Sequence, residues 1–295
     1  ETVSGFTTSG STVTNDDEIL PMGILFWRSF LHWLGGMGIL VLALAIMPTI
    51  GVGAHQIFKA ETTGPISDKV APKLKDTAKI LYIAYLGITV LQTVLLMFGG
   101  MDLFQALIHT FGTVGTGGFS TKNTSVGAFH SSYITLVIGI FMMLSGINFS
   151  LYYELYKKRF RHILQNIELR AYLSIILVST ILIAINIYSL YGSVFESFKH
   201  AFFQVSSIIT TTGYSSVNYD LWPSFSKAIL FFLMFVGGSA GSTGGAIKVI
   251  RIVILFMFVR REIKKLLHPR ALIPIQLNHK MLSGDVVAGV TGFFF

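Results

Sequence analysis

Long apolar runs alternate with short polar segments along most of the chain. A membrane-spanning helix needs about 20 mostly apolar residues. Residues 24–50, 80–98, 133–153 and 171–190 meet this requirement. The stretch 225–259 is long enough for two passes or one broken pass, and residues 286–295 begin another apolar run. The pattern predicts an all-α polytopic membrane protein.

Two shorter amphipathic runs lie between these segments, at residues 102–114 and 196–210. At about 1.5 Å per residue they cross only about two-thirds of a bilayer core. Each is followed by a loop rich in Thr and Gly, then by a polar stretch and a long apolar run. That order is typical of a re-entrant pore loop, in which a half-helix enters the membrane and an extended segment returns.

The unit of long helix, half-helix, Thr/Gly loop and long helix recurs. Its loop glycines Gly10, Gly118 and Gly213 lie 108 and 95 residues apart, and such a spacing indicates internal repeats. We therefore expect helix–pore-loop–helix units around a central pore, with three of four pore loops present. The units are residues 1–58 (loop and inner helix), 59–165, 166–282 (with a broken inner helix) and 283–295 (the start of a fourth). Both ends look truncated, so we expect an internal fragment.

Composition and charge support the membrane assignment. Hydrophobic residues make up 52% of the chain and charged residues 12%, against about 25% charged in soluble domains. The net charge of +8 is concentrated in three linkers, around residues 59–79, 157–170 and 260–280. The positive-inside rule makes these linkers cytoplasmic and places the Thr/Gly loops on the outer side of the plasma (inner) membrane. This clustering argues against a nucleic-acid partner.

The Thr/Gly loops offer oxygen atoms to a dehydrated cation. Rings of backbone carbonyls replace a water shell without fixed charge, and glycine allows the backbone angles that aim successive carbonyls at one axis. One such loop alone would be an ordinary turn, but three at a regular interval favour a selectivity filter that binds a cation. The candidate ion-binding residues are Thr8, Ser9, Gly10, Ser11, Thr116, Gly117, Gly118, Phe119, Thr211, Thr212, Gly213 and Tyr214.

A glycine-rich break divides the run 225–259. Glycine disfavours a helix by about 1 kcal/mol per residue, so we expect the inner helix to break on the cytoplasmic side of the filter and form a movable gate. A close-packed helix kink is the alternative. The gate residues are Gly237, Gly238, Ser239, Ala240, Gly241, Ser242, Thr243, Gly244 and Gly245. Lys248 and Arg251 follow the gate residues. Two roles stay open for them: they repel cations at the inner mouth, or they extend to the inner interface.

Arg28 and His32 share one face of an apolar helix, and we expect them to support a pore loop from behind. No nucleophile, base or cluster of metal ligands is spaced for catalysis, so the sequence predicts no enzyme. The alternatives that stay open are a sodium-permeable cation transporter and a secondary transporter of another solute, with a site at broken helices.

The chain closely resembles the Trk/Ktr/HKT superfamily of potassium transporters, and within it the bacterial Trk-type membrane subunits. The segments that carry this resemblance are residues 5–12, 28–38, 117–121, 210–214 and 237–251, in the order of the family. The resemblance implies four pore-loop repeats in one chain, a homodimer, and filter glycines at Gly10, Gly118 and Gly213.

The resemblance also implies a partner, a cytosolic ring of nucleotide-binding regulatory subunits (TrkA/KtrA-like). Nucleotide would act only through that partner, and no covalently bound cofactor is expected. In plant relatives, serine in place of the first filter glycine accompanies sodium preference, so Gly10 suggests that potassium is accepted.

Overall fold

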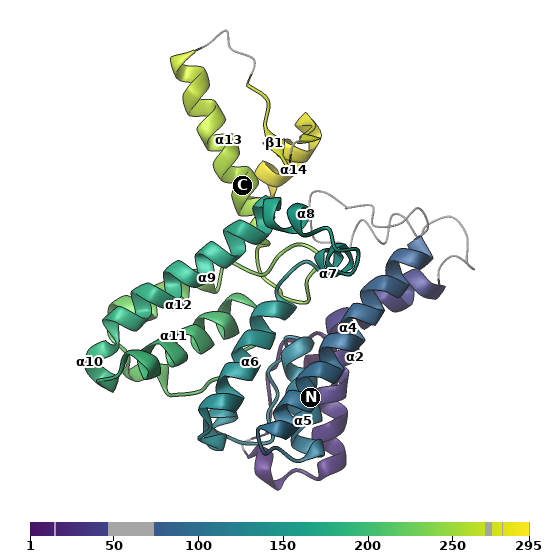
Figure 1. The fold of residues 1–295 in the computed structure, drawn as a ribbon, viewed down its shortest axis with the longest axis vertical. Coiled ribbons are helices and arrows are strands. Elements are labelled where there is room, and N and C mark those ends of the chain that lie inside the picture. The colour runs from purple at the N-terminus through teal and green to yellow at the C-terminus, as the bar shows by residue number, and fades with distance from the viewer. Residues whose placement is uncertain (15, 47–73, 269–272, 279, 295) are drawn as a thin grey trace.

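The computed structural model describes residues 1–14, 16–46, 74–268, 273–278 and 280–294. These residues are mostly helical (Figure 1). The longer helices are α2 (Met22–Ile46), α4 (Leu74–Phe98), α5 (Leu103–Val114), α6 (Ser132–Ser145), α9 (Ile167–Asn186), α11 (Val194–Ile209), α12 (Ser224–Leu233), α13 (Val249–Leu267) and α14 (Gly284–Phe294). The shorter elements are α1 (Thr2–Phe6), η1 (Asp17–Ile19), η3 (Ser125–Phe129), α7 (Phe149–Tyr156), α8 (Phe160–Gln165), α10 (Tyr188–Tyr191), η4 (Tyr219–Leu221), β1 (Gln276–Leu277) and β2 (Lys280–Met281).

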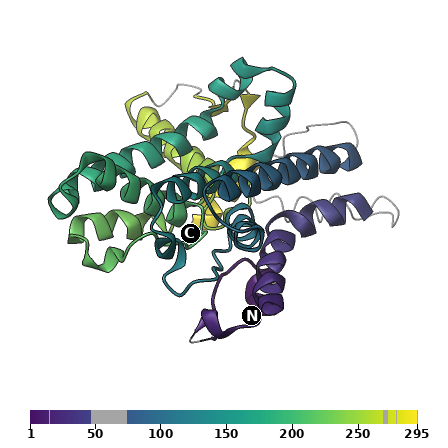
Figure 2. The same ribbon diagram turned by 60° about the horizontal axis from the view of Figure 1, so that its bottom comes forward.

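The two half-helices occupy equivalent places in the bundle. Helix α5 packs against α4 and α6, which precede and follow it, and against the earlier helix α2. Helix α11 likewise packs against α9 and α12 and against the earlier helix α6. The long helices α2 and α4 lie next to each other (Figure 2). Each half-helix thus packs against one helix before it, one helix after it and one earlier helix.

Two glycines allow α2 to approach the ends of the half-helices. A Cβ atom at Gly35 would lie 2.0 Å from the carbonyl oxygen of Phe6, and one at Gly36 would lie 2.6 Å from Cα of Gly115. No larger residue fits at these distances. Small residues allow such close backbone contact between membrane helices.

The spanning helices agree with the sequence prediction in part. Within the described residues, Ile80–Phe98 of α4 and Ile167–Asn186 are long and apolar enough to cross a membrane. The expected single helix over 133–153 is wrong, because α6 and α7 meet at 94° across a break at residues 146–148. Asn148 starts α7 by accepting a hydrogen bond from the Ser150 amide, and contacts with a distant loop, described below, hold the bend.

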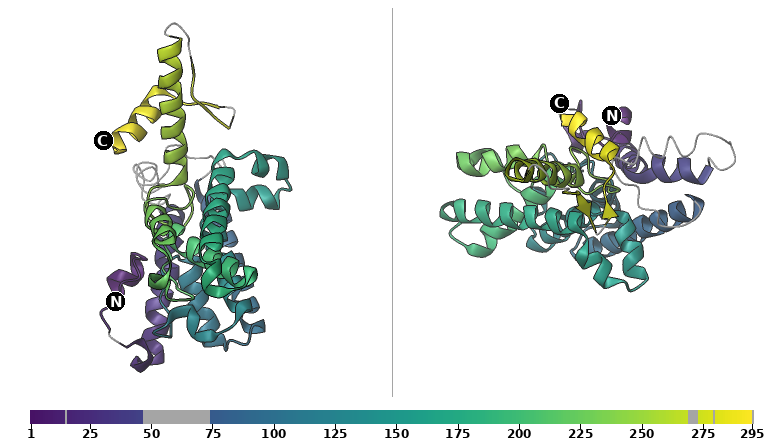
Figure 3. Two further views of the ribbon diagram at one scale, coloured as in Figure 1. Left: turned by 90° about the vertical axis from the view of Figure 1, so that its left-hand side faces the viewer. Right: turned by 90° about the horizontal axis from the view of Figure 1, so that it is seen from above.

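The expected break in the run 225–259 is present. Helix α12 ends at Leu233 and α13 begins at Val249. The backbone between them folds back on itself, with a bridge between Val236 and Ile247. Figure 3 shows α13 extending beyond the bundle, with the β1–β2 hairpin and α14 beside it. Together with Ala240, these elements contribute Ile254, Leu277 and Val290 to one buried apolar cluster.

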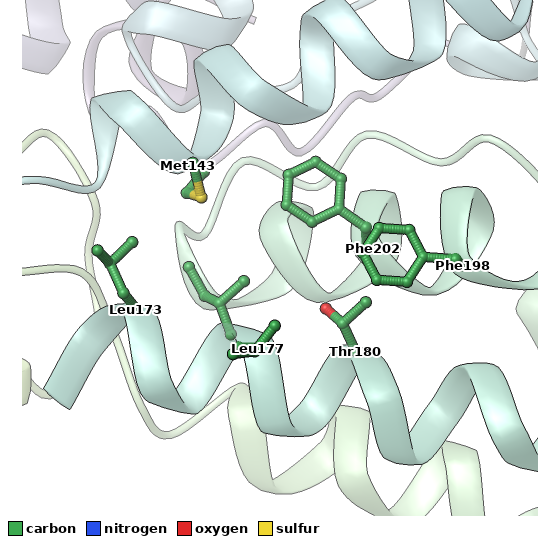
Figure 4. Close-up of a pocket in the computed structure, with 7 residues that line it drawn as sticks. Met143, Leu173, Leu177, Thr180, Phe198 and Phe202 are labelled. Carbon is green, nitrogen blue, oxygen red and sulfur yellow. The ribbon is translucent and has the colours of Figure 1, made fainter. Parts of the chain in front are cut away.

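The membrane-facing surface is apolar, with exposed side chains such as Ile83, Leu91, Leu177 and Phe232. A cavity of about 260 Å³ opens between α6, α9 and α11 (Figure 4). Its lining is Met143, Leu173, Ile176, Leu177, Thr180, Phe198 and Phe202. This cavity offers almost no polar atoms to an ion.

Candidate ion filter and gate

The three Thr/Gly loops leave their half-helices in the same way. The amides of Ser9, Gly117 and Thr212 donate hydrogen bonds of 3.1, 2.9 and 2.9 Å to the carbonyls of Ser4, Gly112 and Ser207. Each bond runs back five residues, as in the Schellman motif at a helix C-terminus. The helix C-terminus carries a partial negative charge, which favours a cation nearby.

The loop conformations also match residue by residue. Thr8, Thr116 and Thr211 adopt φ of 54°, 54° and 58°. Two residues later, Gly10, Gly118 and Gly213 adopt φ of 68°, 80° and 87°. A left-handed conformation costs a non-glycine residue about 1–3 kcal/mol and tends to persist at functional sites. The same strained threonine in three loops therefore indicates a shared task.

Successive loops touch one another through their glycines. A Cβ atom at Gly10 would lie 2.2 Å from the carbonyl oxygen of Gly117, and one at Gly118 would lie 2.0 Å from that of Thr212. The first loop thus abuts the second and the second abuts the third. Gly213 has open space beside it among the described residues. The predicted filter residues Ser9 and Ser11 are exposed, and Thr8 is half-buried.

The aromatic side chains of Phe119 and Tyr214 form the wall between the second and third loops. Both are buried. The Tyr214 hydroxyl donates a hydrogen bond of 2.8 Å to the Phe119 carbonyl oxygen. The imidazole of His32 stacks on the Phe119 ring, with 4.1 Å between ring centroids. A Cβ atom at Gly117 would lie 2.3 Å from Cγ of His32, so the imidazole also fixes the identity of that loop residue.

Arg28 joins the first loop region to the second. Its side chain is 1% exposed. Nη1 lies 2.8 Å from Asp17 Oδ1 and 3.4 Å from Glu1 Oε2, and Nη2 donates a bond of 2.8 Å to the Ser120 carbonyl. Burial would raise the pKa of Asp17, but hydrogen bonds from Arg28 and Thr14 more than offset it and hold the pKa below its ordinary value. Arg28 and His32 thus lie behind the second loop, as expected from the sequence.

The Gly-rich segment 237–245, here called the gate loop, lies directly against two of the Thr/Gly loops. Thr116 Oγ1 donates a hydrogen bond of 2.9 Å to the Thr243 carbonyl. The Gly245 amide donates one of 2.7 Å to Thr211 Oγ1. The two strained threonines therefore bind the gate loop through their hydroxyls. The gate loop therefore lies beside the C-terminal ends of α5 and α11, which these threonines follow.

The gate loop is also fastened to the bend between α6 and α7. The Ser239 amide donates to the Gly146 carbonyl at 2.8 Å, and the Phe149 amide donates to the Gly241 carbonyl at 3.0 Å. Thr243 Oγ1 donates to the Ser145 carbonyl at 3.2 Å. Breaking the helix at residues 146–148 frees the backbone groups that make these bonds. The apolar pattern over residues 133–153 does not predict this bend, and its local signals, Gly146 and Asn148, do not specify the distant groups that hold it.

The two cations after the gate loop have different surroundings. Lys248 is buried and its ammonium group donates to the Gly244 carbonyl. The Arg251 guanidinium lies over the Phe293 ring of α14, 4.2 Å from its centroid. Lys248 therefore places a positive charge at the gate loop, whereas Arg251 packs against a helix beside it. The described residues contain no cluster of His, Cys, Asp and Glu suited to a metal ion.

Comparison with known proteins gives a consistent result. The family model of the TrkH cation transport proteins matches residues 1–295. The Trk system potassium uptake protein TrkH of Escherichia coli K12 is 41% identical over 298 residues, which cover 100% of this chain and 62% of that protein. TrkG of the same strain is 39% identical over 302 residues, covering 100% and 61%. The chain thus spans about 60% of the length of these relatives.

A solved structure has the same fold. The crystal structure of the potassium transporter TrkH from Vibrio parahaemolyticus superposes with a TM-score of 0.83 at 38% identity, covering 99% of this chain and 60% of that one. The likeness extends to the polytopic helical membrane architecture. The chain belongs to the TrkH family of cation transport proteins.

Proposed function

We propose that the full-length protein takes up potassium ions through a pore lined by backbone carbonyls, and that this chain contributes three of its four filter loops. The observation that carries the proposal is the conformation shared by Thr8–Gly10, Thr116–Gly118 and Thr211–Gly213. Three consecutive loops with the same strained backbone, each touching the next, suit a ring of oxygen ligands. The relatives named above are described as potassium uptake proteins.

Within this proposal, potassium is the transported ion and each loop offers it carbonyl and hydroxyl oxygens. The C-terminal ends of α5 and α11 add partial negative charge. Gly213 faces open space here, where a fourth loop would complete the ring. A sodium-permeable cation transporter is the second candidate, because carbonyl rings coordinate both ions.

The gate loop is proposed to close the pore below the filter. Its bonds to Thr116 and Thr211 occupy hydroxyls that would otherwise face a cation, and Lys248 adds a repelling charge. The full-length protein is proposed to form a homodimer and to bind a cytosolic, nucleotide-binding regulatory subunit. The basic end of α13, with Arg260, Arg261, Lys264 and Lys265, is suited to the inner face where such a subunit docks.

Flux measurements on the full-length protein in liposomes test the proposal. Potassium, rubidium and sodium fluxes are compared under a set voltage. Gly118→Ser should lower the potassium-to-sodium ratio by about tenfold, equivalent to ~1.4 kcal/mol, because the new Cβ collides with the Thr212 carbonyl.

Gly100→Ser is the matched control. Gly100 also has a positive φ, 93°, but nothing lies within 4 Å of the place that a Cβ atom would occupy there. Its substitution strains the backbone to a similar degree without touching a filter loop. Equal selectivity of the two variants and the wild type would refute the filter assignment, and absence of cation flux would refute the transport proposal.

A further inference from the structure

A carboxylate that the ion pathway does not use is buried beside the gate loop. Glu168 lies in the first turn of α9 and is 5% exposed. In the sequence it stands within the basic linker around residues 157–170. Acidic side chains buried within the membrane-embedded part of a protein are rare and usually have a functional partner.

One partner of Glu168 is the backbone of the gate loop. The Ala240 amide donates a hydrogen bond of 2.6 Å to Glu168 Oε1. A bond from an amide to a carboxylate is about twice as strong as a bond between neutral groups. Ala240 lies on the first half of the gate loop, so this bond ties that half to α9.

Lys248 holds the second half of the same loop. Its ammonium group is buried and donates to the Gly244 carbonyl. Glu168 and Lys248 also attract each other electrostatically. The two halves of the gate loop are thus held by one acid and one base of opposite charge.

Glu168 is itself positioned from the cytoplasmic side. The Ile167 amide, next to Glu168, donates a hydrogen bond of 3.0 Å to Asn278 Oδ1 in the β1–β2 turn. Leu277 of the same hairpin belongs to the buried apolar cluster that contains Ala240. A displacement of the hairpin would therefore disturb the start of α9 and the gate loop together.

We propose that Glu168 is a positioning residue that latches the gate loop closed, and that the β1–β2 hairpin connects this latch to α13. The proposal rests on the gating function proposed above. In the latched state the Glu168 carboxylate holds Ala240 while Lys248 holds Gly244. Movement of the hairpin withdraws the carboxylate, and the gate loop leaves the pore.

The test uses full-length protein in liposomes without any regulatory subunit. Glu168→Gln keeps the size of the side chain but removes its charge, and should raise basal potassium flux by about tenfold, the difference between a charged and a neutral hydrogen bond. Glu168→Ala should raise it further. Unitary conductance and the potassium-to-sodium ratio should not change, because the latch acts on opening and not on the filter.

Glu154→Gln is the matched control. Glu154 lies on α7 in the same cytoplasmic half and pairs with Arg159 at 3.5 Å, away from the gate loop. The basal potassium flux of the Glu154→Gln variant should equal that of the wild type. The double exchange Glu168→Lys with Lys248→Glu should not restore closure, because a lysine cannot accept the Ala240 hydrogen bond. Full restoration by this exchange would refute a hydrogen-bonded latch.

A second readout does not depend on flux. The chain contains no cysteine, so Ser242→Cys reports the accessibility of the gate loop to a charged thiol reagent once any cysteines elsewhere in the full-length protein are removed. Adding Glu168→Gln should raise the labelling rate by about tenfold, in line with the expected flux. An unchanged labelling rate in a correctly assembled protein would refute the latch.

Deleting residues 239–244 separates this inference from the gating proposal. If the deletion and Glu168→Gln each raise flux, and the two together raise it no more than the deletion alone, the gate and the latch are both supported, since the latch acts only through the loop. If the deletion raises flux but Glu168→Gln alone does not, the latch is wrong and the gate stands. If neither change alters flux, the gating proposal itself is wrong.

Discussion

The Tyr214 hydroxyl donates a hydrogen bond to the Phe119 carbonyl oxygen across 2.8 Å, and so joins the third Thr/Gly loop to the second. Both residues are buried. The same hydroxyl would lie 2.1 Å from a Cβ atom at Gly112, so the half-helix α5 accommodates it only because that position is glycine. This contact fixes the spacing of two loops whose carbonyls are proposed to bind the same ion.

Tyr214→Phe should therefore loosen the filter without unfolding the protein. Losing one neutral hydrogen bond costs about 0.5–1.5 kcal/mol, and the freed Phe119 carbonyl no longer fixes the loop spacing. We expect a lower potassium-to-sodium flux ratio in liposomes. Tyr191→Phe is the control, because the Tyr191 hydroxyl accepts a bond of 3.2 Å from Trp222 Nε1 outside the filter. Loss of selectivity in the control but not in Tyr214→Phe would contradict this interpretation.

Arg28→Gln should be among the most damaging substitutions. It leaves Asp17 without its cation and leaves the Ser120 carbonyl without its donor. Removing one member of a buried ion pair typically costs about 3–5 kcal/mol. We expect a lower thermal unfolding temperature in detergent together with loss of cation flux. Lys122→Gln is the control, since Lys122 pairs with Glu18 at 3.4 Å on the exposed surface. Equal stability of both variants would refute a structural role for Arg28.

The contact between Asp17 and Arg28 also predicts a dependence on external pH. The pKa of Asp17 is lowered in the folded protein, so the stabilisation is complete above the ordinary aspartate value of about 3.9 and is lost as the pH falls through the lower folded value. The contribution of this ion pair to the thermal unfolding temperature should thus not change with pH between about 5 and 7. Asp17→Asn should remove the loss of stability below that range, as measured by thermal unfolding at a series of pH values.

The sequence was sufficient to locate the three Thr/Gly loops and the helix break between residues 233 and 249. Gly10, Gly118 and Gly213 recur in equivalent surroundings, and the structure gives all three a positive φ. Five glycines between positions 237 and 245 were enough to predict that a helix breaks there. These features depend on local backbone chemistry, which composition reveals.

Features that depend on distant contacts could not be predicted. The bend at residues 146–148 lies in an apolar run and is held by bonds from Ser239 and to Gly241. Glu168 resembles any acid in a basic linker until the fold buries it against Ala240. The repeat boundary proposed after residue 58 lies outside the described residues, and the boundaries in general stay predictions.

A last prediction concerns the crossing point of the gate loop. A Cβ atom at Gly237 would lie 1.9 Å from the Gly245 carbonyl oxygen, where the two ends of the loop pass each other. Gly237→Ala should force these ends apart and break the bond from the Gly245 amide to Thr211 Oγ1. We expect higher basal potassium flux with little change in ion preference, measured in liposomes. Gly23→Ala is the control, because nothing lies within 4 Å of a Cβ atom there. Reduced flux in Gly237→Ala would mean that the packed loop supports the open pore, contrary to the proposed gate.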